Sequence, residues 1–174
     1  MSIRVLFVER KPFGSYSIEK AFRDIDAALP EDIHTEFQQL PFGNRFLDTI
    51  RNLLLFRSSP ADVYHITGQV HYMALLFSRR NTILSIMDVR FLYRPAGLRR
   101  WLLKKLYLDW PTRRLDVITA ISEETKREIV AHTGCSPEKI HVLDLPLTPS
   151  GRNPSEEPFD TAEPVILQVG TMEN

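Results

Sequence analysis

The segment Ile3–Val8, with the sequence IRVLFV, is a short apolar run of the kind that forms a buried β-strand. It is followed by a longer stretch in which apolar residues recur every three or four positions. This alternation continues along the chain, and five further runs are predicted to be strands: residues 33–38, 63–66, 82–87, 117–120 and 141–143. Alternating strands and helices predict an α/β fold, a doubly wound Rossmann-like parallel sheet.

Two early helices are predicted to cover the sheet, because each has an apolar face. The first is expected to have Ser17 as its N-cap, and the second to end near Pro60, which cannot continue a helical hydrogen-bond ladder. We expect both apolar faces to point into the core. Their members are Ile18, Phe22, Ile25 and Leu29 in the first helix, and Phe46, Ile50, Leu53 and Leu54 in the second.

A third helix is predicted to begin after Ser122, whose hydroxyl can cap the free amides of the first turn. Glu123 and Glu124 complement the positive end of its dipole, and Gly134 is a typical residue at a helix C-terminus. Capping therefore explains Ser122 and Glu123 without any ligand.

The composition is that of a globular protein, with 43% hydrophobic and 25% charged residues. Because 22 basic residues balance 22 acidic ones, a general nucleic-acid binder held by phosphate neutralisation is disfavoured. Cys135 is the single cysteine, which excludes an internal disulfide and a thiolate zinc site. No metal or other cofactor is predicted. Neither a signal peptide nor a membrane-spanning apolar run is recognised, so we expect a cytoplasmic location.

The composition changes after residue 143. Residues 144–164 hold five prolines and several acids, which predicts an interdomain linker. Residues 165–174 begin with a new apolar run that ends at Gly170. We therefore expect residues 1–143 to form an N-terminal domain, and residues 165–174 to be the first strand of a C-terminal domain that this chain lacks.

Four segments, in order, resemble motifs of bacterial family 4 glycosyltransferases. Residues 61–72 (ADVYHITGQVHY) resemble the third-strand region, and residues 82–88 (TILSIMD) resemble the fourth strand with its terminal His-Asp pair. Residues 117–126 (VITAISEETK) resemble a T-x-I-S-E-x-T-K segment, and residues 166–174 (ILQVGTMEN) resemble the opening strand of the donor domain. The resemblance covers nearly the whole chain.

This resemblance implies one half of a GT-B fold, in which two Rossmann-like domains face each other across a cleft. It implies that the N-terminal domain binds the acceptor and that the C-terminal domain binds a nucleotide-sugar donor, usually with retention of configuration and without a metal. The implied reaction transfers a sugar to a glycan or lipid-linked acceptor, as in cell-envelope polysaccharide biosynthesis. We expect this chain to be inactive without the donor domain.

Three positions depart from the family's pattern. Gln69 stands where relatives carry an acid, Met87 where they carry a histidine, and Leu145 where they carry an asparagine. A thioether cannot donate the hydrogen bond that a histidine gives to a sugar hydroxyl. The departures favour an alternative function, a non-catalytic sugar- or partner-binding pseudoenzyme module.

Candidate site residues lie just past the predicted strands, where doubly wound sheets bind ligands. Asp88 is a catalytic candidate because its carboxylate can orient an acceptor hydroxyl, although it can also be a loop cap. His71 is the second catalytic candidate, since the resemblance favours a site role over an ordinary surface histidine. The acceptor-binding candidates are Gly14, Ser15, Gly68, Gln69 and Arg90.

A basic segment extends from Arg90 to Arg114, with eight basic residues, one acid (Asp109) and interleaved leucines and aromatics. A basic amphipathic helix of this kind can lie on an anionic membrane, which would place the protein at the inner face of the membrane. It can equally be an ordinary helix whose Lys and Arg stems cover its flanks. Both interpretations stay open at this point.

Overall fold

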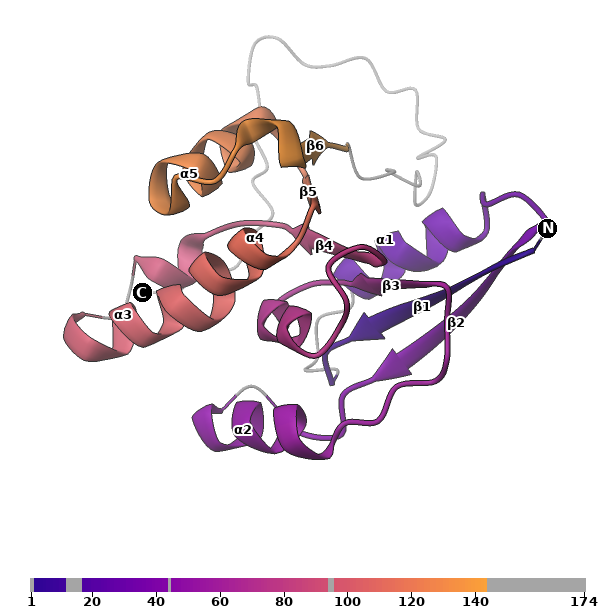
Figure 1. Cartoon of the computed structure of the whole chain (residues 1–174), viewed down its shortest axis with the longest axis horizontal. Coiled ribbons are helices and arrows are strands. Elements are labelled where there is room, and N and C mark those ends of the chain that lie inside the picture. The colour runs from indigo at the N-terminus through magenta and orange to yellow at the C-terminus, as the bar shows by residue number, and fades with distance from the viewer. Residues whose placement is uncertain (1, 12–16, 44, 94–95, 144–174) are drawn as a thin grey trace, which may run out of the picture.

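The structure is a computed structural model that describes residues 2–11, 17–43, 45–93 and 96–143. Within them, six parallel strands form one sheet in the order β2-β1-β3-β4-β5-β6 (Figure 1). The strands are β1 (Ile3–Glu9), β2 (Ile33–Gln39), β3 (Val63–Ile66), β4 (Thr82–Ile86), β5 (Val117–Ala120) and β6 (Ile140–Val142). The predicted α/β fold with a Rossmann-like parallel sheet is confirmed, and the strand bounds differ from the prediction by one residue at most.

The strand order places a topological switch point between β1 and β3. From β1 the chain moves outward to β2 on one side, and then returns to β3 on the other side. In doubly wound sheets, the crevice at the carboxyl ends of the two strands beside such a reversal is the usual ligand site. The loops after β1 and β3 flank this crevice, and the loop after β4 lies next to the loop after β3.

Helical segments connect the strands. They are α1 (Ser17–Asp26), α2 (Phe46–Leu55), η1 (His71–Leu75), η2 (Arg90–Leu92), α3 (Gly97–Lys104), the π-helix η3 (Lys105–Asp109), α4 (Trp110–Arg114), α5 (Glu123–Thr133) and η4 (Pro137–Lys139). Figure 1 shows α2 and α3 on the side toward which the arrowheads of β1 and β2 point. Among the described residues, no helix has the length and apolarity that a membrane span requires.

The core has two parts, one on each face of the sheet. The larger part joins strand residues such as Leu6, Ile66 and Leu84 to Tyr72 of η1 and Leu108 of η3. The smaller part lies under α1, where Phe7, Phe22 and Met87 are buried together with half-buried neighbours such as Ile18 and Ile25. The predicted core face of the first helix is therefore confirmed, although Ser17 is its first residue rather than its N-cap.

The predicted core face of the second helix is wrong for three of its four residues, and Leu53 alone of the four packs against the larger core. In α2, Phe46, Ile50 and Leu54 are exposed, and the buried side chains are Thr49 and Asn52. Asn52 donates to the Tyr72 hydroxyl at 2.9 Å, and the hydroxyls of Thr49 and Tyr107 lie 3.2 Å apart. Buried polar groups are stable when they are hydrogen-bonded, so these two contacts allow α2 to turn its polar side inward. The helix also ends at Leu55, ahead of the expected end near residue 60.

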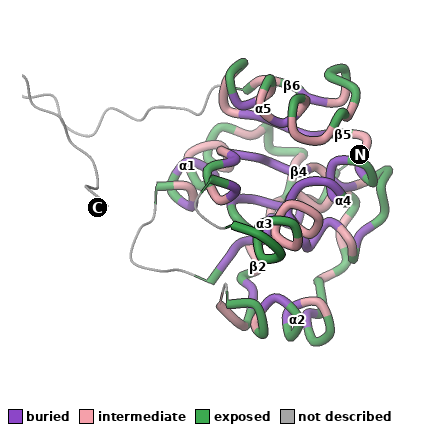
Figure 2. The backbone as a smooth tube through the Cα atoms, turned by 90° about the vertical axis from the view of Figure 1, so that its left-hand side faces the viewer, coloured by how far each residue is buried: buried purple, intermediate pink, exposed green. Residues whose placement is uncertain are grey.

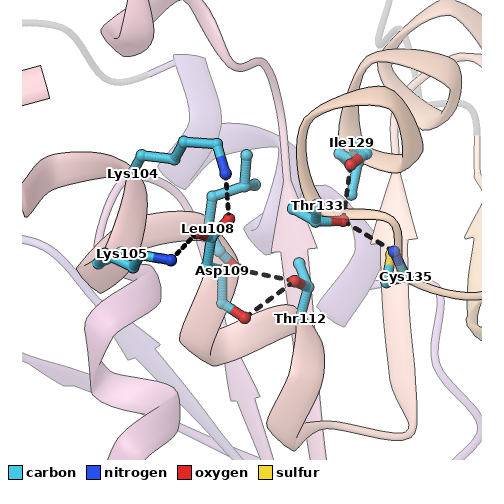
Figure 3. A network of polar contacts seen from close by, with 8 residues as sticks. All are labelled: Lys104, Lys105, Leu108, Asp109, Thr112, Ile129, Thr133 and Cys135. Carbon is cyan, nitrogen blue, oxygen red and sulfur yellow. Dashed lines mark hydrogen bonds and ion pairs between the residues drawn. The ribbon is translucent and has the colours of Figure 1, made fainter. Parts of the chain in front are cut away.

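The predicted basic helix is interrupted by the π-helix η3, in which the backbone N–H of Trp110 donates to the carbonyl of Lys105. Asp109 is buried there, and its two carboxylate oxygens accept from Lys104 at 2.5 Å and Lys105 at 2.8 Å (Figure 3). The hydroxyl of Thr112 donates to the Leu108 carbonyl at 2.8 Å. Two of the eight basic side chains are thus used inside the fold, which reduces the positive charge that the segment presents outside.

The third helix has the predicted ends. The Ser122 hydroxyl accepts from the backbone N–H of Thr125 at 3.1 Å, and Gly134 ends α5 with a left-handed φ of 65°. This arrangement confirms the capping role of Ser122. The predicted linker at 144–164 and the strand at 165–174 lie outside the described residues.

Candidate functional site

A cavity of about 110 Å³ lies beyond the carboxyl ends of β3 and β4. It adjoins a wider hollow of about 740 Å³, and Met87 and Asp88 line both. The first cavity is lined by Gly68, Gln69, His71, Met87, Asp88, Phe91 and Tyr107. Four of the seven site residues predicted from the sequence thus meet around one cavity, and Arg90 lies in the adjoining hollow. Gly14 and Ser15 lie outside the described residues.

Gly68 forms the turn that opens the cavity after β3. Its φ of 67° lies in the left-handed region, and a Cβ at this position would lie 3.6 Å from Cγ2 of Ile18. The preceding Thr67 is held against the end of β1, because its N–H and its hydroxyl both bond to the Val8 carbonyl at 3.0 and 3.2 Å. The glycine therefore has a structural reason to be there, in addition to its place at the cavity.

His71 is the first residue of η1 and is only 2% exposed. Its Nδ1 lies 2.8 Å from the carbonyl oxygen of Tyr107. That carbonyl has no helical N–H partner four residues later, because Pro111 has no backbone N–H. Burial lowers the pKa of His71 to about 4, against the opposing effects of the Tyr107 carbonyl, the Asp88 charge and the Gly68 backbone. His71 is therefore neutral at pH 7, with Nδ1–H donating and Nε2 as an acceptor.

Asp88 is half-buried at the end of β4. Its Oδ1 accepts the backbone N–H of Arg90 at 2.9 Å, so the loop-capping role foreseen as an alternative is present. That bond occupies one carboxylate oxygen and fixes the orientation of the group. Because Asp88 lines both hollows, capping holds it in a suitable place to contact a ligand.

Charged side chains at the end of β1 form a cluster that reaches Gln69. The Nε of Arg10 donates to Glu19 at 2.8 Å, and its Nη1 lies 3.5 Å from Oε1 of Gln69. Glu9 is 1% exposed and pairs with Arg23 at 3.0 Å, yet burial raises its pKa. The amide at position 69 is thus held beside an arginine, where the family's acid would form an ion pair.

Tyr107 and Phe91 were not among the site residues predicted from the sequence. The Tyr107 ring centroid lies 6.2 Å from that of His71 and 5.8 Å from that of Phe91, so an aromatic wall closes one side of the cavity. Such a wall suits the apolar face of a sugar ring. The aromatic residues within the basic segment were the available signal, but the sequence could not show which of them turns inward.

The electrostatics of the cavity favour an uncharged polar ligand. Among the residues that the structure describes, its lining has one carboxylate, a neutral imidazole, an amide and two aromatic rings, and neither lysine nor arginine. A diphosphate requires cations or a set of free backbone amides. No metal-ligating cluster of three or more His, Cys, Asp or Glu side chains exists among the described residues.

The fold and the cavity define an α/β domain with a cavity at the carboxyl ends of its parallel strands, next to the switch point. Flavodoxin-like domains share much of this strand order, so the fold alone does not decide the function. A sequence model of the family described as Glycosyltransferase Family 4 matches residues 14–146. The chain belongs to this glycosyltransferase family, and the resemblance seen in its motifs is confirmed. Among curated proteins, none matches it.

Proposed function

We propose that this domain is the acceptor-binding half of a glycosyltransferase and that the cavity beyond β3 and β4 holds the acceptor sugar. One observation carries the proposal: the described residues that line the cavity combine a carboxylate and aromatic walls, and none of them is a lysine or arginine. A neutral polyol satisfies such a surface, whereas a nucleotide diphosphate does not. The nucleotide-sugar donor would therefore be held by a second, facing domain, and transfer would require both.

In this proposal Asp88 accepts a hydrogen bond from the acceptor hydroxyl that attacks the donor sugar. Its Oδ1 is already bonded to the Arg90 N–H, which leaves Oδ2 for the ligand and limits rotation of the carboxylate. A group held in place by its surroundings orients a substrate at little further entropic cost. Neutral His71 contributes a hydrogen-bond acceptor at Nε2, and Gln69 can bond a further hydroxyl. Arg90 would contact the outer part of the acceptor, because it lines the wider hollow.

A non-catalytic sugar-binding module is the alternative function. Met87 favours it, since that side chain packs with Phe7 and Phe22 and offers no hydrogen bond to a sugar where relatives have a histidine. The two functions share a cavity, and they differ in whether a donor-binding domain adds turnover.

Titration of the full chain tests the acceptor site. In ¹H–¹⁵N NMR spectra, a panel of methyl glycosides and short oligosaccharides should shift the amides around Gly68 and Asp88. Asp88→Asn should weaken that binding about tenfold, because one charged hydrogen bond contributes about 1.5 kcal/mol. The matched control is Asp116→Asn, at an exposed aspartate paired with Arg79. Equal effects of the two substitutions would remove the proposed role of Asp88.

A second experiment tests whether donor binding belongs to another domain. It combines calorimetric titration with uridine and guanosine diphosphate sugars and a product assay on the same sample. We expect at most millimolar binding and no transfer by the domain alone. Micromolar binding with turnover would overturn the proposal. Turnover that appears only when a donor-binding domain is added would exclude the non-catalytic alternative.

We further propose a weak contact between α3–α4 and an anionic membrane at the inner face of the cell membrane. Leu98, Trp101 and Trp110 are 79%, 54% and 44% exposed, and the exposed Arg99 and Arg100 lie among them. Such a surface can rest among lipid headgroups. The protein should cosediment with anionic vesicles at low salt and lose this binding at high salt. Vesicle binding that does not change with salt concentration would contradict the proposal.

A further inference from the structure

A second hollow lies between α2 and α3, with a volume of about 750 Å³. We call it the α2–α3 groove, and it is lined by Arg45, Phe46, Thr49, Leu98, Arg99, Leu102, Leu103, Leu106 and Tyr107. In Figure 2, α3 and the outer turns of α2 are coloured mainly as exposed or half-buried. The volume is within the range of small-molecule sites.

The walls of the groove are apolar and uncovered. Phe46 is 57% exposed and Leu98 is 79% exposed, and the half-buried Leu102 and Leu106 lie along the same hollow. A single exposed leucine is ordinary on a protein surface. A hollow lined by apolar side chains from two helices is unusual, because a ligand that covers them together removes a continuous apolar area from water.

Tyr107 connects the groove to the acceptor cavity, since it lines both. Its hydroxyl lies 3.2 Å from that of Thr49 on α2, and its carbonyl accepts from His71 at the cavity. The π-helix η3 holds it in this position, and π-helical turns often occur at functional sites. Tyr107 is therefore a wall that the cavity and the groove share.

We propose that the acceptor is an amphiphile whose sugar occupies the cavity and whose hydrocarbon chain lies in the α2–α3 groove. This inference rests on the proposed function and selects the lipid-linked class of acceptor. Arg45 and Arg99 line the groove and are exposed, so an acidic linkage such as a phosphate would find its countercharge there.

The charges around the groove disfavour a second copy of the chain as its occupant. Asp48 is the one acid of α2, it lies 3.6 Å from Arg51, and α3 has none. Two copies joined through this face would bring arginines together. A bilayer surface would contact the exposed Leu47 and Leu54 of α2 as well, and neither lines the groove. Substitutions at these two leucines therefore distinguish a hydrocarbon chain bound in the groove from a general apolar contact with a bilayer.

Calorimetry on the full chain with octyl phosphate and decyl phosphate, each below its critical micelle concentration, tests the inference. Each buried methylene should strengthen binding about fourfold, so decyl phosphate should bind about fifteen times more tightly than octyl phosphate. Inorganic phosphate alone should bind weakly. Phe46→Gln and Leu98→Gln should each weaken decyl phosphate binding at least fivefold, whereas the matched controls Leu47→Gln and Leu54→Gln should leave it unchanged.

Other outcomes overturn the inference. An equal loss in all four variants would indicate a general apolar contact, and affinity independent of chain length would exclude a hydrocarbon site. Concentration-dependent dimerisation that Leu98→Gln abolishes would assign the groove to a second copy. The glycoside titration separates this inference from the proposed function: glycosides that bind and respond to Asp88→Asn, with alkyl phosphates that do not bind, would leave the acceptor cavity in place and remove the lipid chain.

Discussion

Acidification should destabilise this domain through two histidines, the buried His71 and the half-buried His65, that the sequence does not distinguish from the others. Burial lowers the pKa of His65 and of His71 to about 4, from the ordinary value of 6.5. Because the pKa of such a histidine is lower in the folded protein than in the unfolded chain, the unfolded chain binds more protons between these two pKa values. Its stabilising effect is therefore complete above pH 6.5 and is lost progressively as the pH falls from 6.5 toward 4.

The size of the effect follows from the two pKa values. At pH 5 the unfolded imidazole is almost fully protonated and the folded one almost neutral, so each histidine costs about 2 kcal/mol relative to pH 7. His65 contacts Phe7 and Phe22 under α1, whereas His71 contacts Tyr107 near the opposite core. Because they share no partner, their effects should add to about 4 kcal/mol. That is a large part of the stability of an ordinary domain.

Urea denaturation at pH 7, 6 and 5 and constant ionic strength measures the loss. His65→Gln and His71→Gln should each reduce the difference between pH 7 and pH 5 by about 2 kcal/mol. His141→Gln, at an exposed position of β6, is the matched control and should change nothing. Glu9 acts in the opposite direction, because burial raises its pKa, but it is present in every variant and cancels in the comparison. If the double variant lost as much stability between pH 7 and pH 5 as the unchanged protein does, the reasoning would be refuted.

Three further substitutions separate structural from functional roles. Gly68→Ala should destabilise the domain by about 1–2 kcal/mol in the same denaturation assay, because the residue keeps a φ of 67°; an unchanged midpoint would contradict this. Asp109→Ala should cost about 2 kcal/mol, because its carboxylate is 2% exposed and both lysine partners keep at least 26% exposure. It should also strengthen vesicle binding by freeing two charges. Ser122→Ala should cost about 1 kcal/mol and leave glycoside binding unchanged, whereas weaker binding would give Ser122 a site role.

The inner strands could be predicted because a parallel strand inside a sheet is covered on both faces and its apolar run needs no partner to be recognised, whereas the edge strand β2 has no fully buried residue. The same reasoning failed in part for α2, where apolar spacing indicated a core face of Phe46, Ile50, Leu53 and Leu54, and Leu53 alone of these packs on the core. Which face of a helix is buried also depends on what the polar side can bond. Thr49 and Asn52 find the hydroxyls of Tyr107 and Tyr72, which are 58 and 20 residues away in the chain. Periodicity within one helix contains no information about such partners.

The candidate site also depends in part on contacts between residues that are distant in the sequence. Gly68, Gln69, His71 and Asp88 could be predicted to cluster, because residues that follow neighbouring parallel strands meet at one edge of the sheet.

Tyr107 could not be placed in the same way, since its position depends on a π-helical turn. The Trp110 N–H bonds five residues back, to the Lys105 carbonyl, and Pro111 offers no N–H to the Tyr107 carbonyl, which is left to accept from His71. The buried charge of Asp109 between two lysines holds this turn in place. A change that restored regular α-helical geometry here would rotate Tyr107 away from both Thr49 and His71. The cavity beyond β3 and β4 and the α2–α3 groove therefore depend on one local departure from helical geometry, and a substitution such as Pro111→Ala should change the binding of both the glycosides and the alkyl phosphates proposed as probes.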